Sequence, residues 1–330
     1  MTIGIGAYGR EAGQAVFEAL RAAEAIGTGA LGGFAVFAAI GEDNSLHIHE
    51  TQRGGSRTLF VEGETTGVPP PGPVASARAA AVISSGPDRP EPLSQFLAAD
   101  PAAGLVTGHR LPNGPGASGS PLNVEALDAL RAGRTAREAV DATIAASAES
   151  DAGLIAVDTR GGVYARNSER VLRRPDLGQA RREDSELGAR VEVLHNAILP
   201  GPAVAAVAAE TALQVMRGKP CADGWVTVPA GISMRLGDEN AVFCNADGLA
   251  THVMTTDPVI VRGHQVGAAV YLASRVYRSD GSDGGDGGDG GGEYLGVTMF
   301  EPIVTVEDGV IVTLSGQREI RISYRAESGP

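Results

Sequence analysis

The chain has 330 residues, 43% of them hydrophobic, and a formal net charge of −13 at pH 7. This length allows one large or two ordinary domains with a buried core. The acidic balance argues against a nucleic-acid partner, because phosphates would be repelled. No apolar run is long enough to cross a membrane, and no basic flank precedes an apolar core at the start. We therefore expect no membrane span, no secretory signal and a cytoplasmic location.

Cysteine and histidine are the residue types that would hold a transition metal. The two cysteines, Cys221 and Cys244, form no CxxC motif and fit reduced, buried thiols of a cytosolic protein better than a disulfide framework. His47 and His49 alternate on an expected strand and so share one face, but no third ligand is identifiable nearby. We interpret them as a hydrogen-bonded pair and expect neither a metal ion nor an organic cofactor.

The first half of the chain alternates helical and extended patterns. Apolar spacing predicts a helix over residues 11–26, closed by Gly27, and Thr135 with Glu138 predicts a capped helix start. Strands are expected at 3–7, 34–40, 45–52, 77–83, 104–109, 153–158 and 163–167, and further helices at 123–131, 135–147 and 203–217.

The second half reads mainly as strands. Residues 173–190 carry mixed charges and predict a solvated connection. Strands are expected at 191–198, 225–235, 241–244 and 258–262, a strand or helix at 266–277, and a hairpin over 304–314. Residues 279–292 are a glycine and aspartate repeat that predicts a flexible loop inserted within one domain.

Thr2 is the residue on which our functional hypothesis depends. Removal of Met1, which a small second residue permits, would leave Thr2 with a hydroxyl and a free α-amine. An α-amine with a pKa near 8 can take the proton of the hydroxyl directly or through a water. Thr2 would then be nucleophile and base together. Internal cleavage that exposes Thr51 instead is left open.

The same stretch contains Gly4-x-Gly6-x-x-Gly9, which has the spacing of a dinucleotide-binding loop. That loop needs a strand before its first glycine and an acidic residue about 20 positions later. Only three residues precede Gly4, and the expected acid is missing. We therefore favour a glycine-rich first strand that packs closely on a helix, and keep a nucleotide-binding enzyme as a less favoured alternative.

The order of several features resembles the N-terminal-nucleophile (Ntn) hydrolases. These features are the opening Met1-Thr2-Ile3-Gly4-Ile5, the Asn113-Gly114 pair after a strand, and the hairpin over 151–164 with its Asp158 and glycine turn. Over residues 1–180 the pattern is similar to the class II glutamine amidotransferases and to an uncharacterised bacterial Ntn-like family. The amidotransferases have Cys where this chain has Thr2, and they lack the helix at 11–26.

The resemblance implies an α+β fold with a four-layer αββα sandwich. The Ntn-like core would cover residues 1–180, and residues 191–330 would form a β-rich C-terminal part that is separate or completes the same domain. By the same resemblance Thr2 matches the nucleophile, Asn113 with Gly114 stabilises the oxyanion, and Arg89 holds a substrate carboxylate.

Other polar residues at the ends of predicted strands are candidates for substrate binding. They are Arg53, His109, Arg110, His195 and Asn196. We expect hydrolysis of an amide bond in a small molecule, and homo-oligomer formation is left open. The alternative from another class is a non-catalytic small-molecule-binding protein on the same fold.

Overall fold

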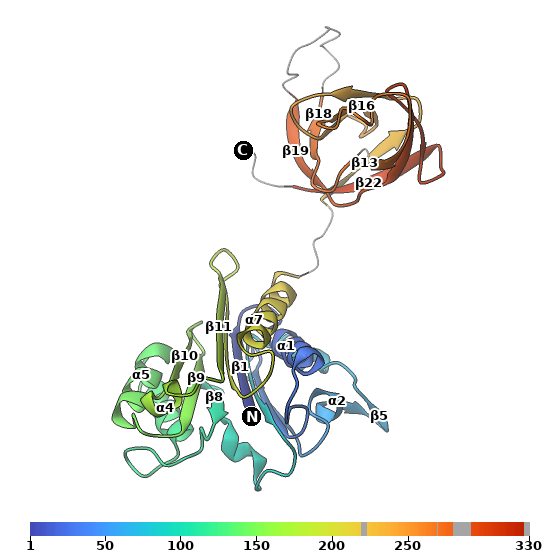
Figure 1. Ribbon diagram of the computed structural model, residues 1–330. Coiled ribbons are helices and arrows are strands. Elements are labelled where there is room, and N and C mark those ends of the chain that lie inside the picture. The colour runs from blue at the N-terminus through green and yellow to red at the C-terminus, as the bar shows by residue number, and fades with distance from the viewer. Residues whose placement is uncertain (219–222, 269, 280–291, 327–330) are drawn as a thin grey trace. The chain divides into compact units, whose positions relative to one another are not determined.

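The computed structural model describes residues 1–218, 223–268, 270–279 and 292–326. The chain forms two compact units, Met1–Lys219 and Pro220–Pro330. The first unit combines helices and strands, and the described part of the second is built from strands (Figure 1). The chain is therefore an α+β protein with a β-rich C-terminal part. The boundary expected between residues 180 and 191 falls inside the first unit, between two paired strands.

A six-stranded antiparallel sheet forms the centre of the first unit. Its order is β11-β12-β1-β6-β2-β3, so the first strand of the chain lies in the middle. The strands are β1 (Thr2–Tyr8), β2 (Ala35–Ile40), β3 (Leu46–Thr51), β6 (Ala79–Ser85), β11 (Leu177–Asp184) and β12 (Ala189–Asn196). The predicted β2–β3 hairpin is confirmed.

β11 corrects the expectation of a solvated connection over residues 173–190. Small buried residues, Gly178 and Ala180, alternate along it with exposed polar and charged ones, Gln179, Arg181 and Glu183. Such alternation is typical of a strand with one face on the core, and the charges protect the edge of the sheet. In the sequence the many charged residues obscure this alternation with a period of two, because the buried positions are small residues rather than large apolar ones.

A four-stranded antiparallel sheet, with order β10-β9-β8-β7, lies against the six-stranded sheet. Its strands are β7 (Ala98–Asp100), β8 (Gly104–Arg110), β9 (Ala152–Asp158) and β10 (Val163–Asn167). The predicted hairpin over 151–164 is thus confirmed as β9 and β10. Helices and short strands occupy the connections: α2 (Ser56–Leu59), β4 (Val61–Glu62), β5 (Thr65–Thr66), α3 (Gly72–Ala75), η1 (Leu93–Phe96) and α6 (Glu169–Leu172).

Helices cover the outer face of each sheet. α1 (Ala12–Ile26) and α7 (Pro202–Arg217) pack side by side on the six-stranded sheet, and α4 (Leu122–Arg131) and α5 (Ala136–Ala146) pack on the four-stranded one (Figure 1). The predicted capping box of α5 is present, since the Thr135 hydroxyl accepts from the Glu138 amide and Glu138 bonds back to Thr135. No helix in the described part of the chain is long and apolar enough to cross a membrane.

Side chains along β1 alternate between the helices and the second sheet. Ile3, Ile5 and Ala7 join the core under α1 and α7, so Gly4 and Gly6 face the other sheet. A Cβ on Gly4 would lie 2.3 Å from the Gly108 carbonyl oxygen. The glycines therefore allow two sheets to approach, rather than a strand and a helix as expected, and both lie inside a strand instead of a phosphate-binding turn.

The second unit is a curled ten-stranded sheet around its own apolar core. Its strands are β13 (Gly224–Pro229), β14 (Ser233–Leu236), β15 (Ala241–Cys244), β16 (Ala250–Thr255), β17 (His264–Ala268), β18 (Arg275–Arg278), β19 (Glu293–Thr298), β20 (Ile303–Glu307), β21 (Val310–Leu314) and β22 (Glu319–Arg325).

Predictions for the second unit are partly confirmed. The hairpin over 304–314 is present as β20 and β21. The strand expected at 258–262 is wrong, because these residues form turns, and β16 had not been predicted. The strand or helix expected at 266–277 is divided between β17 and β18. β18 and β19 pair across the glycine and aspartate repeat, so that segment is an insertion within one sheet. The flexibility expected for the repeat concerns residues 280–291, which lie outside the described residues. Cys221, expected to be a reduced thiol, also lies outside them.

Candidate active site at the start of the first strand

Three polar residues lie side by side where β1 begins. Thr2 is paired in register with Ser85 of β6 on one side and with Asn196 of β12 on the other. Because Ile3 points to the helices, the period of two turns Thr2 and its two partners toward the second sheet. Thr2 is only 6% exposed, and its hydroxyl donates to the Ser85 hydroxyl at 3.4 Å.

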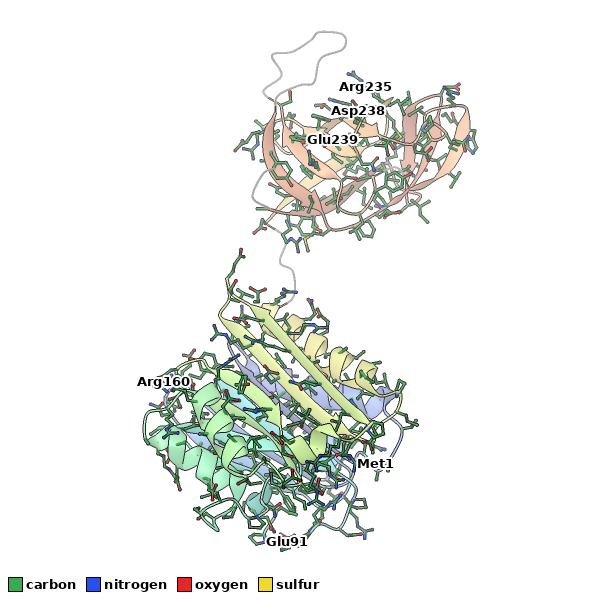
Figure 2. The ribbon with its side chains drawn as sticks, turned by 60° about the vertical axis from the view of Figure 1, so that its left-hand side comes forward. Met1, Glu91, Arg160, Arg235, Asp238 and Glu239 are labelled. Carbon is green, nitrogen blue, oxygen red and sulfur yellow. The ribbon has the colours of Figure 1, made fainter. Side chains whose placement is uncertain are left out.

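Ser85 connects the start of the chain to Arg89. The Ser85 hydroxyl donates to the Met1 carbonyl oxygen and accepts from Arg89 Nη2 at 2.5 Å. The carbonyl bonded to the Thr2 nitrogen is therefore polarised by a hydroxyl that itself accepts from a guanidinium. Met1, labelled in Figure 2, lies at an edge of the first unit.

A buried imidazole and two buried amides come from three other strands. His109 of β8 and Asn167 of β10 share a 2.6 Å hydrogen bond between Nε2 and Oδ1. Asn196 also lies beside this ring, without a hydrogen bond of ordinary geometry. Burial lowers the pKa of His109 to about 4, although the two amides act in the opposite direction. The ring is thus neutral at pH 7.

Several atoms in this set have no hydrogen-bond partner among the described residues. They are His109 Nδ1 and both side-chain amide atoms of Asn196, each in a fully buried residue. Buried polar atoms are costly unless they are paired. The Asn196 amide atoms, on the strand next to Thr2, are thus free to bind a ligand that enters the site.

The α-amine of the chain lies in a cationic environment. Burial lowers the pKa of the Met1 amine, and Arg110, Arg89 and Arg174 lower it further, while Asp176 opposes them. Burial and positive neighbours both favour the neutral form of an amine. The Met1 amine is therefore deprotonated at a lower pH than an exposed α-amine.

The three arginines differ in their partners. Arg110 forms a two-pronged ion pair with Asp151, and Arg174 forms one with Asp176. For Arg89 the described residues provide no carboxylate within ion-pair distance, and its buried Nε has no hydrogen-bond partner among them. Arg89 therefore carries the uncompensated positive charge of this set.

Five of the residues predicted from the sequence lie around the start of β1. They are Thr2, Arg89, His109, Arg110 and Asn196. His195 precedes Asn196 and points to the opposite face, where its Nε2 lies 3.0 Å from the Gly201 carbonyl oxygen at the start of α7. Arg53 is in an exposed ion pair with Asp88, at 2.8 Å.

Asn113 and Gly114 have contacts elsewhere in the described structure. Asn113 Nδ2 donates to Gln95 Oε1 at 2.7 Å, and the Gly114 amide donates to the Leu111 carbonyl within a turn. No hydrogen bond between described residues joins either of them to Thr2. Their predicted oxyanion role stays a prediction.

Four residues of the set were not among the predicted ones. They are Ser85, Asn167, Arg174 and Asp176. Ser85 and Asn167 are the last residues of β6 and β10, which is the signal that a search for polar strand ends would use.

The His47 and His49 pair and a surface hollow both lie outside this set. His47 Nε2 is 3.1 Å from the Ser45 hydroxyl, and the His49 ring packs on Phe60. Within the described ranges no group of three or more His, Cys, Asp or Glu side chains is placed to hold a metal ion. A surface hollow of about 850 Å³ lies at the other end of β1, by Tyr8 and Arg78.

Fold and site together define a two-unit α+β protein with a cluster of polar residues at the start of a central strand. The members of this set are Met1, Thr2, Ser85, Arg89, His109, Arg110, Asn167, Arg174, Asp176 and Asn196. The chain belongs to the family described as a domain of unknown function, DUF6963, whose model matches residues 2–225. That range includes every residue of the set except Met1. Neither the curated proteins nor the solved structures gave a match. The activity therefore has to be inferred from the site.

Proposed function

We propose that this protein hydrolyses an amide bond in a small molecule with Thr2 as an N-terminal nucleophile, on an Ntn-like αββα sandwich. One observation supports this most directly: the hydroxyl of Thr2 is buried between two sheets, and burial with Arg110, Arg89 and Arg174 lowers the pKa of the adjoining Met1 amine, so an amine freed on Thr2 would lie in similar surroundings. In the proposal the protein is cytoplasmic, and methionine aminopeptidase removes Met1.

The reaction would proceed through an ester on Thr2. The hydroxyl oxygen attacks the amide carbonyl while the α-amine takes its proton. The protonated amine then gives that proton to the leaving nitrogen, and the carbon–nitrogen bond breaks. A water molecule, deprotonated by the same amine, hydrolyses the ester and restores Thr2.

Ser85 and Arg89 take the oxyanion role in this proposal. The Ser85 hydroxyl already donates to the carbonyl attached to the Thr2 nitrogen, and Arg89 supports it. Preorganised donors of this kind stabilise the charge that develops on the carbonyl oxygen. Asn113 and Gly114 would then stabilise the loop after β8 through their hydrogen bonds to Gln95 and Leu111.

Asn196 is suited to orient the freed amine. Its side chain is on the same face as Thr2, on the neighbouring strand, with both amide atoms unused. The hydrogen-bonded pair of His109 and Asn167 packs beside it and is neutral at pH 7. The remaining donors of Arg89, with Arg110 and Arg174 nearby, favour a substrate that carries a carboxylate.

The test begins with protein purified from a host that has methionine aminopeptidase. Its intact mass should be short by one methionine. A β-lactone should then acylate Thr2, adding the whole lactone mass, because ring opening forms an ester without a leaving group. Thr2→Ala should abolish the adduct, and Thr2→Ser should retain it. An adduct that persists in Thr2→Ala would refute the proposal.

Non-catalytic binding of a small anion is the second candidate. The Ser85 hydroxyl donates to the Met1 carbonyl, a contact that a protein with Met1 in place would keep. A mass that shows Met1 in place would remove the free amine of Thr2. Arg89, whose buried Nε has no hydrogen-bond partner among the described residues, would then be the ligand-binding group, and its substitution by Met should abolish carboxylate binding in calorimetry.

A further inference from the structure

The loop after α1 forms a slot that holds the Met1 side chain. The Ala30 amide donates to Met1 Sδ at 2.9 Å. A Cβ on Gly29 would lie 2.4 Å from the same sulfur, and Gly29 has φ of +140°, so a side chain there is both strained and obstructed. Thr28 ties the loop to Leu199 through two backbone hydrogen bonds. The wall of the slot is thus fixed backbone.

Met1 marks the path of any acyl group bonded to Thr2. Its carbonyl carbon is bonded to the Thr2 nitrogen, and Oγ of the same residue reaches that carbon through a five-membered ring. An acyl carbon on Oγ therefore lies close to the position of the Met1 carbonyl carbon, and its chain starts close to the Met1 side chain. Ser85 donates to the carbonyl oxygen in this position.

Two properties of the slot restrict the acyl chain. The Met1 side chain is unbranched at Cβ, and its sulfur lies against backbone atoms of Gly29 and Ala30, where a branch has little room. The Ala30 amide is a donor at the δ position, so an acceptor atom there is favoured. Met1 is 41% exposed, so the slot is open to solvent on one side.

The surroundings of the Met1 amine add a charge preference. This amine occupies the position that an α-substituent of the acyl group would take, and Arg110, Arg89 and Arg174 act on it. Asp176 opposes the three arginines, but Asp176 is paired with Arg174, whereas Arg89 bonds to the Ser85 hydroxyl that holds the Met1 carbonyl and has no carboxylate partner among the described residues. A neutral or negative α-substituent is therefore favoured there over an α-ammonium.

We propose that the substrate's acyl group is a straight chain of about methionine length, with an acceptor at its δ position and no α-ammonium, and that it lies in the Met1 slot. This inference rests on the proposed function and assigns its substrate class. It separates this site from that of an aminopeptidase.

The test uses a series of p-nitrophenyl esters on protein that lacks Met1. The Thr2 hydroxyl forms the new ester bond, p-nitrophenolate leaves and is followed by absorbance, and the α-amine takes the proton. The mass of the acylated peptide confirms Thr2 as the site. We expect 4-(methylthio)butanoate to react about tenfold or more faster than 3-methylbutanoate or the methionine ester. The pentanoate ester, which lacks the acceptor, should be intermediate.

Gly29→Ala fills the slot and gives the matched variant. It should slow acylation by the methylthio ester about tenfold or more and leave the acetate ester unchanged, since acetate has no chain to place there. Gly32→Ala is the control, because Gly32 also has positive φ (+71°) in this loop but its Cβ meets nothing closer than 3.8 Å. It should change neither rate.

The outcomes separate this inference from the proposed function. If Thr2 is acylated without preference for the straight chain, or if Gly29→Ala keeps the wild-type chain preference, the slot is wrong and the proposed function stands. If no ester acylates Thr2, the proposed function is refuted as well. If Gly29→Ala also loses its reaction with the acetate ester, the variant is damaged more widely than in the slot. The preference of the wild-type protein for the straight-chain ester then decides whether the slot inference holds.

Discussion

Burial of Glu192 makes the stability of the first unit depend on pH. Glu192 is on β12, and the period of two turns it toward the second sheet, as it does Leu194. It is 3% exposed, and one carboxyl oxygen has no hydrogen-bond partner among the described residues. Burial raises its pKa to about 7; Arg181, 3.8 Å away, and Arg137 oppose this, and Glu183 adds to it.

The magnitude follows from the two pKa values. The ordinary value for Glu192 is 4.5, so folding raises it by about 2.5 units, or about 3 kcal/mol at 1.36 kcal/mol per unit. Well below pH 4.5 the carboxyl is protonated in both the folded and the unfolded state, and its burial then has no pH-dependent cost. The cost grows as the pH rises and is complete above pH 7. The free energy of unfolding of Glu192→Gln, relative to that of the wild type, should therefore rise by about 2.5 kcal/mol from pH 5 to pH 8.

The assay is urea unfolding of the full chain at these two pH values. The helices of the described structure all lie in the first unit, so far-ultraviolet circular dichroism reports its transition, while Trp225 fluorescence reports the second unit. Glu210→Gln is the control, because Gln214 and Arg182 hold the pKa of Glu210 below its ordinary value. Its difference from wild type should be the same at both pH values. A pH-independent difference for Glu192→Gln would refute the reasoning.

Three further predictions concern the same unit. Thr135→Ala removes the cap of α5 and should cost about 1 kcal/mol in urea unfolding, whereas Thr135→Ser should keep most of it. Gly4→Ala would press a Cβ to 2.3 Å from the Gly108 carbonyl and should cost about 1–3 kcal/mol, while Gly72→Ala meets nothing within 4 Å and should leave the melting temperature nearly unchanged. Burial lowers the pKa of His109 to about 4 from 6.5, so its contribution to stability is present above pH 6.5 and is lost as the pH falls through 4. Its ring signals in NMR should not titrate between about pH 8 and pH 5, and titration near 6.5 would contradict its burial.

The candidate site was partly predictable because each strand delivers polar residues at its end. Thr2, Arg89 and Asn196 could be chosen in this way, since each follows or begins an apolar run. Ser85 could not be ranked above other serines, because its importance comes from pairing with a residue 83 positions away. Asn167 depends on a hydrogen bond across 58 positions.

His195 shows the opposite case. It is next to Asn196, and the sequence supports both equally. The sheet turns them to opposite faces, so Asn196 lies beside Thr2 while His195 bonds to Gly201. A shift of the β1–β12 register by one residue would exchange them.

The sequence by itself determined the local elements, including the helix α1, the capped start of α5 and the β9–β10 hairpin, because helical spacing, capping and turn chemistry act over a few residues. It also singled out Thr2. Only the tertiary structure decided that Gly4 and Gly6 face a second sheet, that β11 is a strand, that Ser85 and Asn196 flank Thr2, and that His109 lies beside Asn196. These outcomes depend on the register of strands far apart in the chain and on the packing of one sheet against another, which no local pattern contains.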